Sequence, residues 1–216
     1  MRRAPWPVGL LFGLGVALLI VLAGPLLLFN PWFVDALQAR HDVADRLAVS
    51  DDEVSRVTGE VLVDLYFAGD FDVALPDGTP LLGARERSHM SDVAGLFRLL
   101  VLVAGVAGAV VALTHAALRA DPRRVGAILL AVGGGLAAAA LLAALVFAVA
   151  FEPAFLAFHT VFFPPGTYLF GPDSNLIRLF PGAFWFDASL VAGATILVPA
   201  ALVALAGWRM LRAHGA

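Results

Sequence analysis

Two histidines lie where this chain could move protons. His89 precedes Asp92 by three residues in the run Arg-Glu-Arg-Ser-His-Met-Ser-Asp at 85–92, so one helical turn would bring the imidazole and the carboxylate to one face. An imidazole titrates near neutral pH, and a neighbouring carboxylate can orient it and stabilise its charged form. The spacing indicates a general acid or base, although Ser88 as a helix N-cap and Asp92 near the positive end of the helix dipole would give the run a structural role.

The second histidine, His159, lies in the run Phe-His-Thr-Val-Phe-Phe at 158–163 and has few polar neighbours in the sequence. A histidine in apolar surroundings is more often a packing residue than a catalytic one. Its meaning depends on whether the elements of the chain bring it near His89. Four polar residues further on could reach a site that the two histidines share: Tyr168, Asp173, Asn175 and Arg178.

The elements that must position these residues are membrane-spanning helices. The chain has 216 residues, of which 61% are hydrophobic and only 14% are charged, and this composition excludes an ordinary soluble protein. A spanning helix needs about 20 mostly apolar residues. Four segments without any charged residue meet this requirement: 7–29, 99–118, 125–151 and 188–208. The sequence therefore predicts an all-α membrane protein, a bundle of four transmembrane helices.

The arginines predict the orientation of this bundle. Seven of the fourteen Arg, with Asp121 as the only acid, fall in three short segments: 1–6, 119–124 and 209–216. The two longer segments, 30–98 and 152–187, hold the other seven Arg and sixteen acids. Because short Arg-rich segments stay in the cytoplasm, both termini are predicted to be cytoplasmic and both longer segments to lie outside. His89 and His159 would then share one membrane face, where polar groups in an apolar interface indicate function.

The outer segment 30–98 is predicted to hold a small α+β structure. Ser50 and Glu53 form a capping box, and the apolar residues that follow recur at helical spacing, which predicts an amphipathic helix over 51–68. A turn signal, Pro-Asp-Gly-Thr at 76–79, has apolar residues on both sides and predicts a small hairpin.

The outer segment 152–187 holds close to half of the chain's aromatic residues, together with five prolines. Aromatic rings gather at the membrane interface, and the prolines prevent one continuous helix. Irregular backbone at that depth must be buried in protein or line a wet cavity. The composition therefore predicts an aromatic, Pro-rich interfacial loop that lines a cavity beside both histidines.

Around both histidines the sequence resembles the lipoprotein intramolecular transacylases, bacterial four-span membrane proteins with two functionally important histidines on the outer side. The resemblance rests on three runs: Glu-Arg-Ser-His-Met-Ser-Asp-Val at 86–93, Phe-His-x-x-Phe-Phe at 158–163, and 174–181 followed by Phe184-Trp185. The layout of the spans and the outer segment between the first two also agree. The resemblance therefore covers nearly the whole chain.

The resemblance implies an acyltransferase of the bacterial cell membrane. Its substrates would be the N-termini of diacylglyceryl lipoproteins, and the enzyme would move the sn-2 acyl chain to the α-amino group of the N-terminal Cys, which gives the lyso form. His89, His159 and Asp92 would be catalytic, with no metal or other cofactor. The residues that could bind substrate are Tyr168, Asp173, Asn175, Arg178, Glu86, Met90, Phe162 and Phe163.

Under this hypothesis His159 is the base, since an apolar setting keeps it neutral. His89, oriented by Asp92, would polarise the ester carbonyl or protonate the leaving alcohol, and the two roles could be exchanged. No protein nucleophile is needed, because the amine and the ester are already held in one molecule. The chain accordingly has no need of cysteine, of which it has none.

Two other function classes remain open from the sequence. A metal-dependent membrane hydrolase would use His89, Asp92 and His159 as ligands of a zinc-like type. A non-enzymatic lipid sensor or assembly protein would use the aromatic segment as a binding surface. No nucleic acid is expected as a partner, because the net charge is −3 and no basic run occurs.

Overall fold

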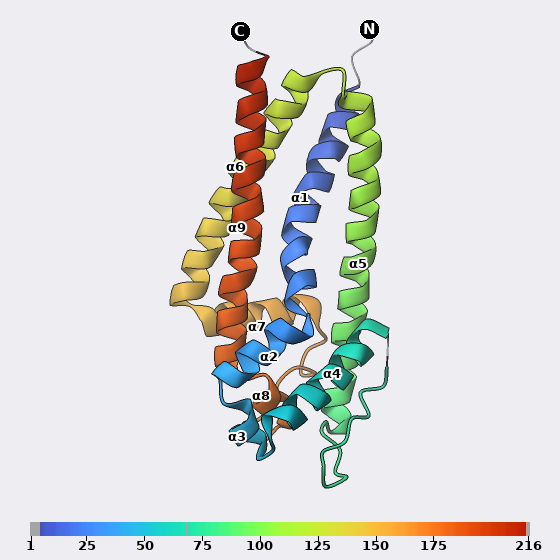
Figure 1. The fold of residues 1–216 in the computed structure, drawn as a ribbon, viewed down its shortest axis with the longest axis vertical. Coiled ribbons are helices and arrows are strands. Elements are labelled where there is room, and N and C mark those ends of the chain that lie inside the picture. Colours follow the sequence, from blue (N-terminus) through green and yellow to red (C-terminus); the bar gives the residue numbers. More distant parts are fainter. Residues whose placement is uncertain (1–4, 68, 215–216) are drawn as a thin grey trace. The chain divides into compact units, whose positions relative to one another are not determined.

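The computed structural model describes residues 5–67 and 69–214, and these residues form nine α-helices (Figure 1). The four long helices are α1 (Trp6–Leu28), α5 (Ala84–Leu118), α6 (Pro122–Val149) and α9 (Gly182–Ala213). The five shorter helices are α2 (Pro31–Arg40), α3 (Val43–Leu47), α4 (Asp51–Phe67), α7 (Phe151–Phe162) and α8 (Asn175–Leu179). Arg2 and Arg3, which contributed to the predicted orientation, and Ala68, the predicted end of a helix, lie outside the described residues.

One compact unit contains the described residues 5–26, 100–145 and 191–214, most of which belong to the four long helices. All four helices are long and apolar enough to cross a membrane. The side chains at the centre of the unit are Phe12, Val16, Ile20, Leu118, Val125 and Ala200. Other large apolar side chains point outward, as Leu113 does with 74% of its surface exposed. Apolar side chains on the outside of such helices suit contact with lipid, so the chain is a multi-pass membrane protein.

Glycines let α6 and α9 approach each other closely in this unit. A Cβ atom on Gly133 would lie 2.5 Å from the carbonyl oxygen of Ala200, and one on Gly207 would lie 2.4 Å from the backbone nitrogen of Leu130. Small residues at a helix contact are typical of membrane bundles, where close packing replaces the hydrophobic effect between helices.

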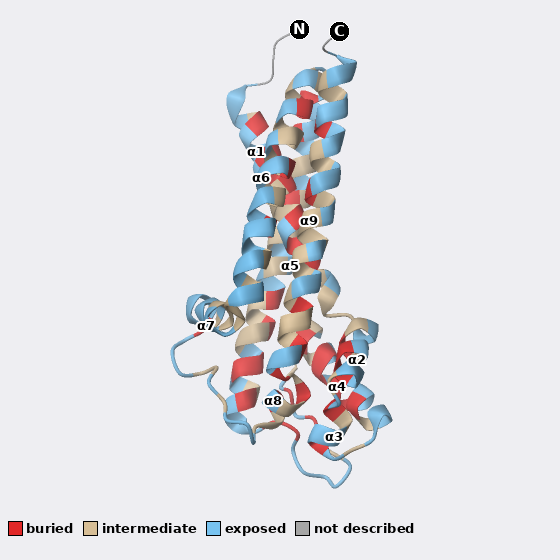
Figure 2. Ribbon diagram, turned by 90° about the vertical axis from the view of Figure 1, so that its left-hand side faces the viewer, coloured by how far each residue is buried: buried red, intermediate tan, exposed pale blue. Residues whose placement is uncertain are grey.

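The other compact unit contains the described residues 27–67, 69–99 and 146–190. Within it α2 packs on α4, and α3 packs on α2, α4 and α8. Figure 2 shows buried residues on α2, α4 and α8, whereas α7 has none. A buried hydrogen-bond chain joins these helices, because Thr58 donates to the side-chain oxygen of Gln38 at 3.0 Å and the Gln38 amide donates to the Leu179 carbonyl at 3.2 Å.

Helix α4 forms where the sequence predicts an amphipathic helix. The Ser50 hydroxyl accepts a hydrogen bond from the backbone N–H of Glu53, as an N-cap does. The apolar residues at helical spacing are buried: Val54, Val57, Val61, Leu62 and Leu65. The second half of the capping box differs from the prediction, because the Glu53 carboxylate accepts hydrogen bonds from Arg56. The Arg56 guanidinium holds the pKa of Glu53 below its usual value.

The predicted hairpin is reduced to a turn. The described residues contain no strand, and one antiparallel bridge joins Ala74 to Pro80. The backbone N–H of Leu75 donates to the Thr79 carbonyl at 2.8 Å, and that of Leu81 donates to the Val73 carbonyl at 2.7 Å. Proline at both 76 and 80 removes donors that a longer ladder would need, so the pairing ends after one bridge. The unit is therefore helical and irregular rather than α+β.

Helix α5 begins at Ala84, well before the apolar segment at 99–118. The Glu86 carboxylate accepts a hydrogen bond from the backbone N–H of Gly83 at 2.6 Å, which caps the helix start. Ser88 therefore lies inside the helix, and its predicted role as N-cap is wrong. An apolar segment predicts only the part of a helix that contacts lipid, whereas the capping residues predict where the helix begins.

The predicted interfacial loop at 152–187 is largely helical. It holds most of α7, all of α8 and the start of α9. Pro153 falls in the first turn of α7, where its missing N–H has no helical partner to lose. The irregular part that remains is the stretch at 163–173, which we call the aromatic loop because Phe163, Tyr168 and Phe170 lie in it.

Candidate active site

The two histidines lie against each other. Their ring centroids are 6.0 Å apart, with the ring planes stacked at 29°. His89 comes from the first turns of α5, and His159 comes from the last turn of α7. The two residues are 70 positions apart in the sequence, so the aromatic loop and α7 must fold back on α5 to join them.

The His159 ring is held by its own helix. Its Nδ1 lies 2.8 Å from the carbonyl oxygen of Phe155, one turn earlier in α7. Because a carbonyl only accepts, this hydrogen bond assigns the proton to Nδ1, and in the neutral imidazole Nε2 then carries the lone pair. The arrangement presents Nε2 of His159 as a base.

The His89 ring is buried, with 6% of the residue exposed. Its Nδ1 atom is also buried and has no hydrogen-bond partner among the described residues. A buried polar atom without a partner costs free energy, and native proteins tolerate few of them. Such an atom is available to a group that enters the site, such as the oxygen or nitrogen of a substrate.

Asp92 does not orient His89 as the sequence suggested. No hydrogen bond or ion pair joins the two side chains in the part of the chain that the structure describes, although Asp92 follows His89 by nearly one turn of α5. A three-residue spacing places two side chains on one face of a helix but does not fix their rotamers. Asp92 contributes a negative charge near the imidazole rather than a hydrogen bond.

Aromatic rings enclose both imidazoles. The Phe163 ring lies 4.9 Å from the His89 ring and 5.5 Å from the His159 ring, between centroids. The Phe170 ring lies 5.7 Å from His89, and the Tyr168 ring lies 5.3 Å from His159. All three come from the aromatic loop, which therefore forms a wall of the site.

The aromatic loop has two tight turns. The Thr167 N–H donates to the Pro164 carbonyl at 3.2 Å, and Gly166 has a φ of 81° at the third position of this turn, as a type II turn requires. At the far end the Ser174 N–H donates to the Gly171 carbonyl at 3.1 Å. The Ser174 hydroxyl then caps α8 by accepting from Ile177.

Glu86, a predicted substrate-binding residue, has its carboxylate occupied within the protein. Besides Gly83, it accepts hydrogen bonds from the Ser174 hydroxyl and from the backbone N–H of Leu176, the latter at 3.0 Å. The residue is 9% exposed. Glu86 therefore connects the start of α5 to the start of α8.

Some of the other predicted site residues lie beside the two histidines, and the rest make contacts elsewhere in the unit. The hydroxyl of Tyr168 lies 3.2 Å from that of Thr160, beside His159. Phe162 is half exposed and packs on Phe158, and Met90 is buried. Asn175 donates to the Leu81 carbonyl at 2.9 Å and accepts from Arg178, whose guanidinium also lies 3.9 Å from Asp173. No ring contact or hydrogen bond joins this last group to either imidazole within the described residues.

Sequence reasoning missed Arg85, which contacts the aromatic loop. Its guanidinium donates to the carbonyl oxygens of Gly166 and Leu169 at 3.2 and 3.3 Å. Backbone carbonyls are common to all residues, so no residue type marks such a contact in a sequence.

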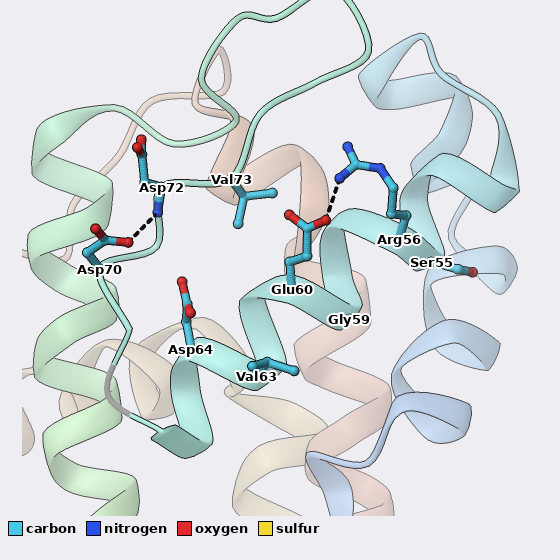
Figure 3. A pocket seen from close by; sticks show the side chains of 9 residues that line it. All are labelled: Ser55, Arg56, Gly59, Glu60, Val63, Asp64, Asp70, Asp72 and Val73. Carbon is cyan, nitrogen blue, oxygen red and sulfur yellow. Dashed lines mark hydrogen bonds and ion pairs between the residues drawn. The ribbon is translucent and has the colours of Figure 1, made fainter.

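One cavity of the unit lies away from the histidines. It has a volume of about 500 Å³ and is formed by α4 and the segment 70–73 (Figure 3). Its acidic side chains already have partners, since Glu60 pairs with Arg56, Asp72 pairs with Arg87, and Asp64 accepts from the Phe71 N–H. We therefore place the site at the histidines on chemical grounds, because the cavity holds no imidazole.

The metal-dependent alternative requires His89, Asp92 and His159 to converge. Across residues 5–67 and 69–214, no three His, Cys, Asp or Glu side chains are grouped so that they could hold a metal ion. The arrangement instead offers two imidazoles suited to proton transfer.

Comparisons with known proteins give one family. A family model described as lipoprotein intramolecular transacylase Lit matches residues 10–185. The chain is similar to the in meso structure of the membrane integral lipoprotein intramolecular transacylase Lit from Bacillus cereus, with 18% identity, a TM-score of 0.84 and 95% of each chain covered. Two structures of that protein with one histidine substituted match at 18% identity, with TM-scores of 0.75 and 0.76, and cover 95% of this chain and 91% and 93% of theirs. No curated protein sequence matches the chain.

Proposed function

The chain belongs to the lipoprotein intramolecular transacylase family and is an acyltransferase, and we propose that His89 and His159 carry out its proton transfers. The two imidazole rings stack with their centroids 6.0 Å apart, and aromatic rings surround them, which is the main support for the proposal. Within the described residues, each ring keeps a nitrogen that makes no hydrogen bond to the protein, Nε2 in His159 and Nδ1 in His89.

The reaction moves the sn-2 acyl chain of a diacylglyceryl group to the α-amino group of the lipoprotein's N-terminal Cys. The amine starts as an ammonium ion, which has no lone pair with which to attack the ester. A base must first remove a proton, and the glycerol oxygen must gain one when its bond to the acyl carbon breaks. The products are an amide, which keeps one N–H, and a free hydroxyl, so the ammonium nitrogen loses two protons, of which one arrives at the glycerol oxygen and the other is released to solvent.

His159 is the base in this proposal. The hydrogen bond from its Nδ1 to the Phe155 carbonyl leaves the lone pair on Nε2, and the helix fixes the direction of the ring. Once protonated, Nε2 can also return a proton to the glycerol oxygen. The Tyr168 ring beside it limits where the substrate amine can lie.

His89 acts on the ester. The proposal assigns its unpartnered Nδ1 as the donor to the carbonyl oxygen, on which negative charge develops during attack. The negative charge of Asp92 would favour the protonated form of this ring, from which a proton can be donated. Phe162 and Phe163 supply apolar surface for the acyl chain, whereas the proposal does not use Asp173, Asn175 or Arg178.

The site is proposed to face the outside of the cell membrane, with both termini in the cytoplasm. The support is the charge of the segments, since 30–98 and 152–187 hold sixteen of the seventeen acids. The site is proposed to lie next to membrane lipid, because the acyl chains of a diacylglyceryl lipoprotein anchor it in the bilayer.

The test is mass spectrometry of lipoprotein N-termini from a host without N-acylation, with and without this gene. We expect an N-acyl, S-monoacylglyceryl Cys only with the gene. His89→Asn and His159→Asn should each lower its formation by at least about 100-fold. His214→Asn is the matched control, because His214 also bonds through Nδ1 to the carbonyl four residues earlier but is exposed. Product from both single variants at the control level would refute the two-histidine mechanism.

A further inference from the structure

Arg85 holds the middle of the aromatic loop. It is the second residue of α5, and one of its guanidinium nitrogens donates to the carbonyl oxygens of Gly166 and Leu169. The guanidinium carbon also lies 5.7 Å from the centroid of the Phe170 ring. One side chain thus contacts the loop at three positions.

The part of the loop that Arg85 contacts has little other support. Among the described residues, the main chain at 168–170 makes no backbone hydrogen bond, since those of the loop are at Phe163 and at its two turns. The Tyr168 hydroxyl lies beside Thr160, and this is a contact of the side chain. The carbonyl bonds to Arg85 therefore fix the backbone between the turns.

This backbone carries the rings that touch the imidazoles. Phe170 lies against His89, and Tyr168 lies against His159. A guanidinium suits the task, because a terminal nitrogen carries two N–H donors that point in different directions while the planar group lies over an aromatic ring. Lysine would keep the charge but lose the planar group.

We propose that Arg85 is a positioning residue for the acyl transfer, which holds the aromatic loop against His89 and His159. This inference rests on the proposed function. Arg85 is exposed and donates to two neutral carbonyls, so we expect its loss to release the loop without unfolding the protein.

The first measurement is kinetic, with purified protein in micelles and a diacylglyceryl lipopeptide as substrate. Arg85→Gln should lower kcat by about tenfold with KM changed less than about twofold. A displaced aromatic loop disturbs the positions of the two imidazoles during the reaction more than it weakens substrate binding. Arg85→Lys should recover part of kcat. Arg87→Gln is the matched control, since Arg87 lies two residues on in α5 and pairs with Asp72 instead of the loop.

The second measurement follows the loop directly. The chain has no Cys, so Leu169→Cys provides a single site for a nitroxide label, and the Leu169 side chain is 58% exposed. The electron paramagnetic resonance spectrum should show a more mobile label with Arg85→Gln, an intermediate one with Arg85→Lys and no change with Arg87→Gln. Circular dichroism of each variant checks that it is folded, because a global loss of folding would lower the helical signal and would not follow this order.

The outcomes separate the two proposals. Lyso product from the unsubstituted chain, together with unchanged kcat and unchanged label mobility in Arg85→Gln, would overturn the role of Arg85 alone. Absence of lyso product from the unsubstituted, folded chain would overturn the proposed function, and with it the inference that depends on it.

Discussion

The carboxylate of Glu86 accepts a hydrogen bond from the backbone N–H of Leu176 at 3.0 Å, across 90 residues of sequence. The same carboxylate accepts from Gly83 and Ser174. Three residues after Glu86 comes His89, and just before Ser174 the aromatic loop ends. One buried carboxylate thus fixes both the helix that carries one imidazole and the far end of the loop that encloses it.

Replacing Glu86 with glutamine should destabilise this connection. One end of the glutamine side chain is an NH₂ group, which cannot accept the hydrogen bonds that the carboxylate oxygen accepts. At least one buried donor therefore loses its partner, at a cost of about 1–3 kcal/mol. We expect a lower thermal midpoint in micelles. Glu60→Gln is the control, since Glu60 is paired with Arg56 on an exposed surface and its loss should cost less than about 1 kcal/mol. Equal midpoints for the two variants would contradict the role given to Glu86.

Tyr168 contacts His159 through its ring rather than its hydroxyl. Tyr168→Phe keeps the ring at His159 and removes only the hydroxyl beside Thr160, so activity should fall less than about fivefold. Tyr168→Ala removes the ring and should reduce the lyso product much further. The comparison is made by mass spectrometry of one lipopeptide substrate with both variants. A loss with Tyr168→Phe as large as with Tyr168→Ala would assign the hydroxyl to the chemistry instead.

Gly166 is needed for its backbone conformation. Its φ of 81° lies where a side chain is strained, and a Cβ atom there would meet nothing within 4 Å, so Gly166→Ala tests the backbone alone. We expect a cost of about 1 kcal/mol, visible as increased proteolysis of the loop and reduced activity. Gly171→Ala in the same loop is the control, because its Cβ also meets nothing and its φ is not in the left-handed region. Identical proteolysis of the two variants would show that the turn tolerates a side chain.

The sequence predicts the elements of this protein better than their contacts. The family resemblance read from the motifs, the four apolar helices and α4 all follow from patterns along the chain, and the structure and the family comparison confirm them. The hairpin extends over one bridge and Ser88 is not the cap, because a turn signal and a capping residue state a local preference that neighbouring residues can override.

The contacts of the candidate site depend on residues far apart in the sequence. Glu86 was assigned to substrate because its motif neighbours His89, and only the folded chain brings Ser174 and Leu176 to its carboxylate. Arg85 gave no signal, since its partners are main-chain carbonyls 81 and 84 residues away. Side-chain rotamers likewise decide that Asp92 makes no hydrogen bond to His89, and spacing alone does not contain them.

The close approach of α6 to α9 requires that residue 133 has no side chain, as in glycine. A Cβ there would lie 2.5 Å from both the Ala200 carbonyl oxygen and the Ala204 backbone nitrogen, so neither helix can yield by turning a side chain. Gly133→Ala should separate the helices and cost about 1–3 kcal/mol, measured as a lower thermal midpoint in micelles. Gly134→Ala is the matched control, because a Cβ on Gly134 meets nothing within 4 Å and alanine favours the helix. If the Gly133 variant were as stable as the Gly134 variant, the two helices would not pack as closely in the membrane as they do in this structure.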